Sequence, residues 1–369
     1  MRMAVRMALG IWLMTGVYYI FLGVTTKPSE GDSLAYHLPL ARIIADGRIA
    51  DKSGYTFPGA YFPGMGEAMQ AVLMKAGVPL NLFNFFGWVM LFWIVRKIGK
   101  ELGWGRGWPE MAAVAVCMWP SVLRLLPTQT VDIWVGVWWG WVWLLLMRQR
   151  QVWILGLAAG LLVGTKISGI LYILPLLVIY GQSWKKKDLV IAGIVALVIG
   201  GSWYIRNWVW TGNPVYPASM WIWKGMEGFR TNEWAVWKTL LLYKGGWGIF
   251  AQALTSEYLL WGWGLLMMLI VDSGKLKVLM GLNFLVYLLL PSWPENTLSD
   301  LRYAYPVFIP VVAAAVEQWG RRRSGEGLLA AMVLMMAAVL TQLDYRPKLF
   351  AGVIVMWLIL QSTPGVKEK

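Results

Sequence analysis

Long apolar segments recur along the whole chain, and they restrict its fold more than any other feature. A helix needs about 20 mainly apolar residues to cross the roughly 30 Å of hydrocarbon in a bilayer. The chain has 369 residues, of which 58% are hydrophobic and only 14% are charged. A soluble domain of this length could not bury so much apolar surface. The sequence therefore predicts an all-α polytopic membrane protein with a single domain over residues 1–369.

The hydropathy pattern predicts about twelve transmembrane helices. They are expected at Met7–Val24, Pro79–Val95, Trp108–Leu126, Val131–Met147, Val152–Gly164, Ser168–Tyr180, Leu189–Ile205, Leu254–Val271, Leu276–Pro291, Tyr303–Gln318, Leu328–Gln342 and Leu349–Gln361. The first span is too long for a signal-peptide core and has no cleavage site after it, so we interpret it as a retained helix.

Short basic clusters between the spans predict the topology. They are Arg96, Lys97, Lys100 and Arg106; Arg148 and Arg150; Lys185–Lys187; Lys275 and Lys277; Arg321–Arg323; and Lys367 and Lys369. With the amino terminus in the cytoplasm, every cluster falls on the cytoplasmic side. Three connections then lie outside, at about 26–78, 207–250 and 292–301. The net charge of +14 is explained by these clusters, so no nucleic-acid partner is expected.

The first outer connection holds the densest group of ionisable residues. It contains His37, the only histidine of the chain, together with Asp32, and Glu67 follows closely. Its pattern predicts a short amphipathic helix on the membrane surface as far as Asp46, with Gly47 as the carboxyl cap.

A second helix is expected directly after this one, over Glu67–Lys75. Further along, two short spans should meet on the outer side at Gly164-Thr165-Lys166, which would place Lys166 near the lipid head groups.

Six stretches of the sequence together resemble the GT-C superfamily of polyprenyl-phosphate-sugar-dependent glycosyltransferases, in particular bacterial members like glycosyltransferase family 39. They are GDSLAYHLP at 31–39, FPGMGE at 62–67, TQTVD at 128–132, GLLVGTKISG at 160–169, WYIRNWVWTGNPVYP at 203–217 and DLRYAYP at 300–306. They span most of the chain in the order of the family. The resemblance implies a GT-C-like helical bundle whose first outer loop carries a membrane-surface helix.

The resemblance also implies an activity and a location. The expected protein is a glycosyltransferase of a bacterial inner membrane that moves a sugar from a polyprenyl-phosphate donor to a lipid, glycan or protein acceptor outside the cytoplasm. Carried over to this sequence, Asp32 would be the catalytic base or would orient the acceptor. The chain departs from better-known relatives because it has no clear Asp-Glu pair after its first helix, which leaves the acceptor class open.

The reaction itself calls for the same residue types. An acceptor hydroxyl must lose its proton, and a positioned carboxylate can take it. The leaving lipid phosphate needs cations, for which Lys166, Arg206 and Arg302 are the candidates at predicted outer boundaries.

The other candidates are catalytic roles for Glu67 and His37, and substrate binding by Tyr36, Asp132, Asn213 and Tyr303.

Each candidate also has a structural alternative. Asp32 could cap a helix, Lys166 could extend toward head groups, and Arg206 and Arg302 could anchor the chain at the interface. Asn213 lies in the sequence NPVYP, which is typical of a rigid turn.

The sequence leaves a metal cofactor open. Asp32, Asp51 and Glu67 could hold Mg²⁺ or Mn²⁺ through oxygen atoms. The single histidine and the lone Cys117 argue against zinc and against a disulfide.

An alternative function is a transporter or flippase of lipid-linked sugars. Such proteins usually contain inverted repeats with broken helices at the bilayer midplane. No repeat is visible here, and the charges gather at the outer boundary, so the sequence favours the transferase.

Overall fold

The computed structural model describes residues 2–149, 151–219, 222–227, 229, 235–269, 273–292, 296 and 300–320. The two spans expected over 328–342 and 349–361 lie outside these ranges, as do Arg150 and the basic clusters at 321–323 and 367–369. Within the described ranges the chain is helical and contains no strand, which confirms the all-α prediction.

The main helices are α1 (Arg2–Thr25), α2 (Leu38–Ala45), α3 (Met65–Lys75), α4 (Phe83–Glu101), α5 (Trp108–Cys117), α6 (Pro120–Leu125), α7 (Asp132–Arg148), α8 (Val152–Thr165), α9 (Ser168–Tyr180), α10 (Lys186–Gly200), α11 (Ser202–Thr211), α12 (Val236–Leu242), α13 (Gly246–Tyr258), α14 (Gly274–Leu289) and α16 (Tyr305–Gly320). The chain also contains a π-helical segment, η1 (Ser33–His37), and 3₁₀ helices that include η3 (Pro58–Tyr61), η7 (Leu259–Leu269) and η9 (Leu301–Ala304).

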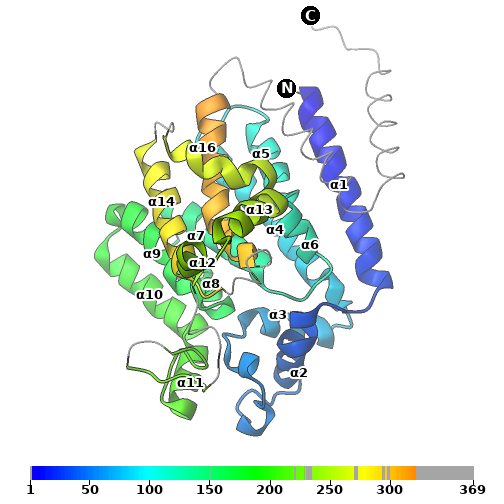
Figure 1. Cartoon of the computed structure of the whole chain (residues 1–369), viewed down its shortest axis with the longest axis vertical. Coiled ribbons are helices and arrows are strands. Elements are labelled where there is room, and N and C mark those ends of the chain that lie inside the picture. The colour runs from blue at the N-terminus through cyan, green and yellow to red at the C-terminus, as the bar shows by residue number, and fades with distance from the viewer. Residues whose placement is uncertain are drawn as a thin grey trace, which may run out of the picture.

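Few of the described helices are long enough to cross a bilayer alone. Two helices, Met3–Thr25 and Leu80–Glu101, have the length and apolar composition of a span. A third span results if α10 and α11, which meet at an angle of 58°, are counted as one. The shorter helices include α7, α8 and α9, which pack beside one another in the bundle (Figure 1).

Three predicted spans are broken, which corrects the prediction that each is one helix. The predicted span 189–205 is divided between α10 and α11 by the 58° bend. The segment 108–126 forms α5 and α6, with Trp119 in an extended conformation between them. Pro120 causes the break, because proline disfavours a helical conformation in the residue before it and has no backbone N–H. The segment 254–271 is also not one α-helix, because α13 ends at Tyr258 and the tighter 3₁₀ helix η7 follows it over Leu259–Leu269.

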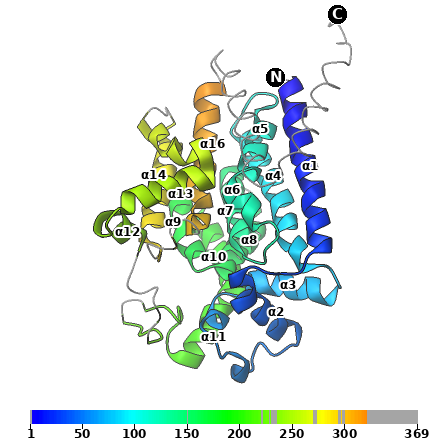
Figure 2. The same cartoon turned by 45° about the vertical axis from the view of Figure 1, so that its right-hand side comes forward.

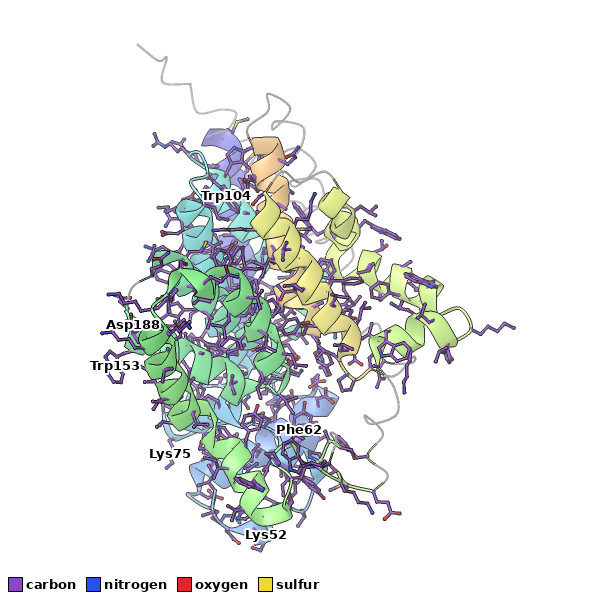
Figure 3. All side chains as sticks on the ribbon, turned by 90° about the vertical axis from the view of Figure 1, so that its left-hand side faces the viewer. Lys52, Phe62, Lys75, Trp104, Trp153 and Asp188 are labelled. Carbon is purple, nitrogen blue, oxygen red and sulfur yellow. The ribbon has the colours of Figure 1, made fainter. Side chains whose placement is uncertain are left out.

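The polar connections form a layer at one end of the bundle. In Figures 1 and 2, α2, α3 and α11 lie at the end opposite the amino terminus of α1, with α3 across the base of the bundle. Lys52 of this layer and Trp104, beside the basic cluster 96–106, lie toward opposite ends of the molecule (Figure 3). The first connection and the basic cluster 96–106 therefore lie at different ends, while Asp188, beside the cluster 185–187, lies between them (Figure 3).

Both short helices expected in the first connection are present. The helix α2 ends at Ala45, and Gly47 follows with a φ of 72°, a left-handed conformation that favours glycine. Its buried face, Leu38, Leu40, Ala41 and Ile43, contacts the rest of the layer. The second helix, α3, begins at Met65, two residues before the predicted start.

The helices α8 and α10 pack through a seam of small residues that the sequence analysis did not recognise. Gly156, Gly160 and Gly164 repeat every fourth residue on α8, and Ala192, Ala196 and Gly200 do so on α10. A Cβ added at Gly200 would overlap the carbonyl oxygen of Gly160, so the two backbones are in contact. Small residues at this spacing are typical of close helix pairs in membranes. The seam fixes the end of α8, after which Lys166 follows.

We expect Gly200→Val to destabilise the protein by about 3 kcal/mol or more, because backbone atoms cannot move aside as a flexible side chain can. Gly193→Ala is the matched control, since a Cβ at Gly193 in the same helix meets no atom within 4 Å. Thermal unfolding of the detergent-solubilised variants measures the difference. Equal unfolding temperatures for the two variants would contradict the role assigned to the seam.

Candidate active site

Four charged residues from distant parts of the chain form a continuous line of ion pairs. A guanidinium nitrogen of Arg302 lies 2.5 Å from a carboxylate oxygen of Asp32. On its other side, Nε of Arg302 lies 3.6 Å from Asp132. Asp132 in turn accepts a hydrogen bond of 2.5 Å from Nζ of Lys166. The outer connection, η9, α7 and the α8–α9 junction therefore converge at one place.

Lys166 occupies the break between two short helices, as the sequence predicts. It follows α8 with extended backbone angles, φ −156° and ψ 142°, and α9 begins two residues later. Its ammonium group lies 3.6 Å above the centre of the Tyr303 ring, a cation–π contact. The side chain is 23% exposed and paired with Asp132, so it does not simply extend toward head groups.

Asp132 is buried at the start of α7, with only 3% of its side chain exposed. The loop before it is held by Asn84, whose amide group donates to the carbonyl oxygens of Leu125 and Thr130 at 3.0 and 2.9 Å. The backbone N–H of Gln129 also donates to the Ser33 hydroxyl at 3.0 Å, which ties this loop to the first outer connection. These hydrogen bonds fix the backbone position from which the side chain of Asp132 extends.

Asp32 is the most exposed member of the line. Its side chain is 39% exposed, while that of Arg302 is 9% exposed. Asp32 precedes η1 but makes no side-chain capping hydrogen bond, so capping does not account for it. Its carboxylate is held by Arg302 and retains a face open to solvent.

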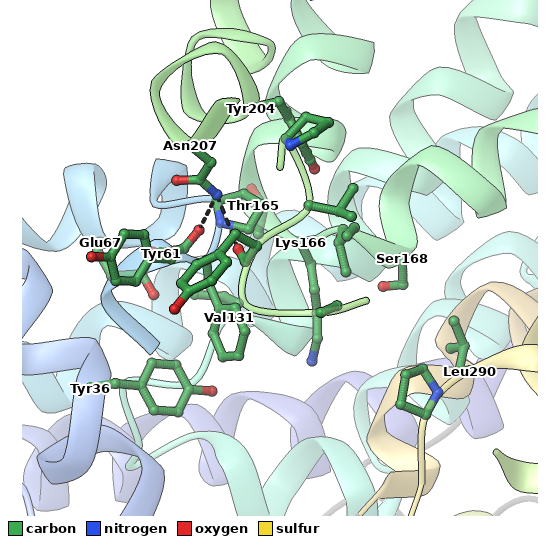
Figure 4. A pocket seen from close by; sticks show the side chains of 18 of the residues that line it. Tyr36, Tyr61, Glu67, Val131, Thr165, Lys166, Ser168, Tyr204, Asn207 and Leu290 are labelled. Atoms are coloured by element: carbon green, nitrogen blue, oxygen red, sulfur yellow. Dashed lines mark hydrogen bonds between the residues drawn. The ribbon is translucent and has the colours of Figure 1, made fainter. Parts of the chain in front are cut away.

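A cavity of about 170 Å³ lies beside this line and is bounded by residues from several helices. Tyr36, His37, Glu67, Lys166 and Tyr303 are among the residues that line it (Figure 4). Asp32, Arg302 and Arg206 are not among the lining residues. The cavity therefore brings together five of the ten candidates from the sequence, and Asp32 and Arg302 join them through Asp132.

Tyr36 places a phenol in the wall of the cavity. Burial, and then the carboxylate of Asp32, raise the pKa of Tyr36 well above its usual value, so the group stays a neutral hydrogen-bond donor. Its ring packs so closely on Gly59 that a Cβ at Gly59 would collide with it. The FPG turns of the outer connection thus hold this ring in place.

His37 and Glu67 form a second, separate pair in the same wall. Nδ1 of His37 lies 2.5 Å from Oε1 of Glu67. The two residues are 2% and 1% exposed, respectively. The ring of Tyr36 lies 4.1 Å from that of His37, measured between centroids. His37 therefore orients Glu67.

Two candidates from the sequence are occupied elsewhere. Arg206 donates to Asn207, to the Tyr55 hydroxyl and to the Ala60 carbonyl, and it lies against the rings of Tyr55, Trp203 and Trp210.

The side chain of Asn213 donates to the carbonyl oxygens of Ala218 and Lys224 and accepts from the N–H of Val215. It organises the turn that its NPVYP context indicates. The structure places neither Arg206 nor Asn213 at the ion-pair line.

One residue beside the line was not recognised as a site residue from the sequence. Asp300 is 7% exposed and precedes Arg302 by two positions. Burial is the largest effect and raises the pKa of Asp300 to about 6. The positive charges of Arg302 and Lys166, and hydrogen bonds with Ser292 and Tyr303, act in the opposite direction. Its place in the DLRYAYP stretch, so close to Arg302, was the available signal.

The carboxylates proposed for a metal do not gather. Asp51 is exposed and accepts bonds from Ser53, while Asp32 and Glu67 have the separate partners given above. Throughout the described ranges, no group of three or more His, Cys, Asp or Glu side chains could hold a metal ion. The described residues therefore do not fit a metal centre.

An apolar groove of about 370 Å³ adjoins the cavity. Both hollows are lined by Tyr204 and Pro214, so they are neighbours. The groove runs along α10 and α11 past Gly193, Leu197 and Trp208, and its walls are almost wholly apolar. The cavity, with the polar groups of His37, Glu67 and Lys166 in its wall, thus borders the apolar groove near the bend between α10 and α11.

Comparisons with known proteins identify the fold. No family model matches the chain, and no curated protein does. Among solved structures, the chain is similar to the crystal structure of ArnT from Cupriavidus metallidurans bound to undecaprenyl phosphate, with a TM-score of 0.55 and 14% sequence identity. The match covers 96% of this chain and 72% of that one. The chain therefore shares the all-α fold of that structure, which agrees with the GT-C-like helical bundle expected from the sequence.

Proposed function

We propose that this protein is an integral-membrane glycosyltransferase. It would move a sugar from a polyprenyl-phosphate donor to a lipid, glycan or protein acceptor on the extracytoplasmic side. The observation that carries the proposal is the line Asp32–Arg302–Asp132–Lys166 beside a cavity in a GT-C fold. Undecaprenyl phosphate bound to ArnT supports a lipid donor of this class.

Asp32 is the proposed base. It takes the proton of the acceptor hydroxyl while the hydroxyl oxygen forms a bond to the anomeric carbon of the sugar. The bond from that carbon to the phosphate oxygen breaks, and the lipid phosphate leaves with the electron pair. Of the carboxylates in the line, Asp32 alone is substantially open to solvent, whereas Asp132 is enclosed by two cations. Its exposure suits contact with an acceptor arriving from outside.

Lys166 and Arg302 are the proposed cations that stabilise the leaving phosphate. Lys166 lines the cavity, and only one of its protons is used in the bond to Asp132. Nε of Arg302 faces Asp132 at 3.6 Å, and a second guanidinium nitrogen contacts Asp32, so Arg302 contributes its positive charge from beside the cavity. Lys166 is therefore the cation that retains donors for an anion in the cavity. In a partly dry site such donors can contribute several kcal/mol to stabilising the departing charge.

The apolar groove is the proposed path of the polyprenyl chain. It borders the cavity through Tyr204 and Pro214 and offers almost no polar group. A lipid lying along α10 and α11 would bring its phosphate to the end of α8, where Lys166 is located. The groove and the cations together fit the two chemically different halves of such a donor.

Asp32→Asn should reduce transfer by about 10² to 10⁴, because the amide cannot take up the proton. The assay follows radiolabelled sugar from a panel of polyprenyl-phosphate sugars into acceptors in native membranes. Asp46→Asn is the matched control, since Asp46 is an exposed carboxylate of the same connection, 57% exposed and paired with Arg48. Full transfer by Asp32→Asn would exclude Asp32 as the base.

Lys166→Met should weaken binding of sugar-free undecaprenyl phosphate by about tenfold to a hundredfold, which corresponds to the loss of one charge-assisted hydrogen bond. Lys187→Met, at an exposed basic position in α10, controls for the general loss of charge. Equilibrium binding to detergent-solubilised protein measures both. Unchanged affinity in Lys166→Met would remove this lysine from the proposed phosphate site.

Gly193→Leu should block the groove and lower the affinity for undecaprenyl phosphate while leaving the affinity for a short-chain isoprenyl phosphate unchanged. The added side chain enters open space, because a Cβ there meets no atom within 4 Å. Gly248→Leu in α13 is the control, since it meets the same open surroundings away from the groove. Equal binding of the long lipid by all three proteins would show that its chain lies elsewhere.

A further inference from the structure

The His37–Glu67 pair is a buried polar feature that the proposed transfer does not use. Both residues line the cavity that Lys166 lines, and both are almost fully buried. Their mutual contact, Nδ1 to Oε1, is the one ion pair found for Glu67 in the described ranges. Among the described residues, no lysine or arginine forms an ion pair with this carboxylate, whereas Asp32 and Asp132 both have cationic partners.

One oxygen of Glu67 has unused hydrogen-bonding capacity. Oε2 is buried and has no hydrogen-bond partner in the described structure. Leaving such a group unpaired costs about 1–3 kcal/mol or more for a charged oxygen, so a purely structural role would favour an apolar or fully paired residue. A ligand whose hydroxyl donates to Oε2 would remove this cost.

The surroundings of the pair match the chemistry of a sugar. The ring of Tyr36 packs against His37 at 4.1 Å, so a carboxylate and an aromatic group share one wall. The hydroxyl groups of a sugar can donate hydrogen bonds to the carboxylate of Glu67, and its C–H faces can pack on the ring of Tyr36. The cavity of about 170 Å³ beside the pair provides the space for such a ligand.

The position within the cavity also fits. If Lys166 holds the donor phosphate, the sugar attached to that phosphate must occupy the adjoining space, which Glu67 and His37 border. We propose that the His37–Glu67 pair binds the sugar of the donor, with Glu67 accepting a hydrogen bond from a sugar hydroxyl and His37 holding the carboxylate in position. This inference rests on the proposed function and makes Glu67 a specificity-determining residue.

The test compares two ligands, sugar-free undecaprenyl phosphate and the undecaprenyl-phosphate sugar that binds the wild type most tightly among its glucose, mannose, galactose and N-acetylglucosamine forms. Glu67→Gln should weaken binding of the sugar-bearing ligand about tenfold to a hundredfold and leave binding of the sugar-free lipid unchanged. His37→Phe should act in the same direction, because it removes the group that orients Glu67. Unchanged binding of the sugar-free lipid also shows that each variant is folded.

Two further variants separate the possible failures. Lys166→Met should weaken both ligands, and if it weakens neither, the proposed donor site itself is wrong. Glu257→Gln removes another buried carboxylate, which pairs with Arg124 outside the cavity, and should weaken neither ligand. If Lys166→Met weakens both ligands while Glu67→Gln weakens both equally or neither, the sugar-binding role of the pair is overturned and the phosphate site stands.

Discussion

The pairing of Asp132 with Lys166 and Arg302 is the interaction on which the site depends. A buried carboxylate without partners is strongly destabilising, and removing one partner of such a group typically costs 3–5 kcal/mol. Asp132 is 3% exposed and begins α7, Lys166 follows α8, and Arg302 lies in η9 before α16. Its charge is balanced only when these elements meet. The same requirement that holds the bundle together therefore also places two cations beside one cavity.

Local features of the sequence were sufficient to predict the two short helices of the first connection and the break at Lys166. Gly47 sets the end of α2, because the left-handed conformation of the residue after a helix is a local requirement that glycine meets. Likewise, two apolar runs too short to cross a bilayer could only meet at a break, and Lys166 lies in that break. Pro120 was an equally local signal for the division of α5 from α6. The fourfold spacing of small residues on α8 and α10 could also have been recognised as a packing seam.

The partners of individual side chains could not be predicted in this way, because they depend on which helices meet. Arg206 and Arg302 look alike in the sequence, each near an outer boundary and among aromatic residues. Packing places Arg206 among Tyr55, Trp203 and Trp210, where its donors are satisfied, and places Arg302 between two carboxylates. His37 and Glu67 are 30 residues apart, and only the fold brings them into contact. The contacts and exposure of each side chain in the folded state, rather than its residue type, distinguish the structural role of Arg206 from the place of Arg302 in the ion-pair line.

The position of Arg302 also addresses an electrostatic difficulty of the proposed reaction. A carboxylate base must remain ionised beside the lipid phosphate, and two anions close together repel each other strongly in a low-dielectric site. Arg302 contacts Asp32 at 2.5 Å on one side and faces Asp132, with Lys166 behind it, on the other. A phosphate held by Lys166 would thus be separated from Asp32 by a buried guanidinium. Because an arginine stays protonated under all ordinary conditions, its positive charge lies between the two negative groups and can stabilise the charge that develops on the leaving phosphate.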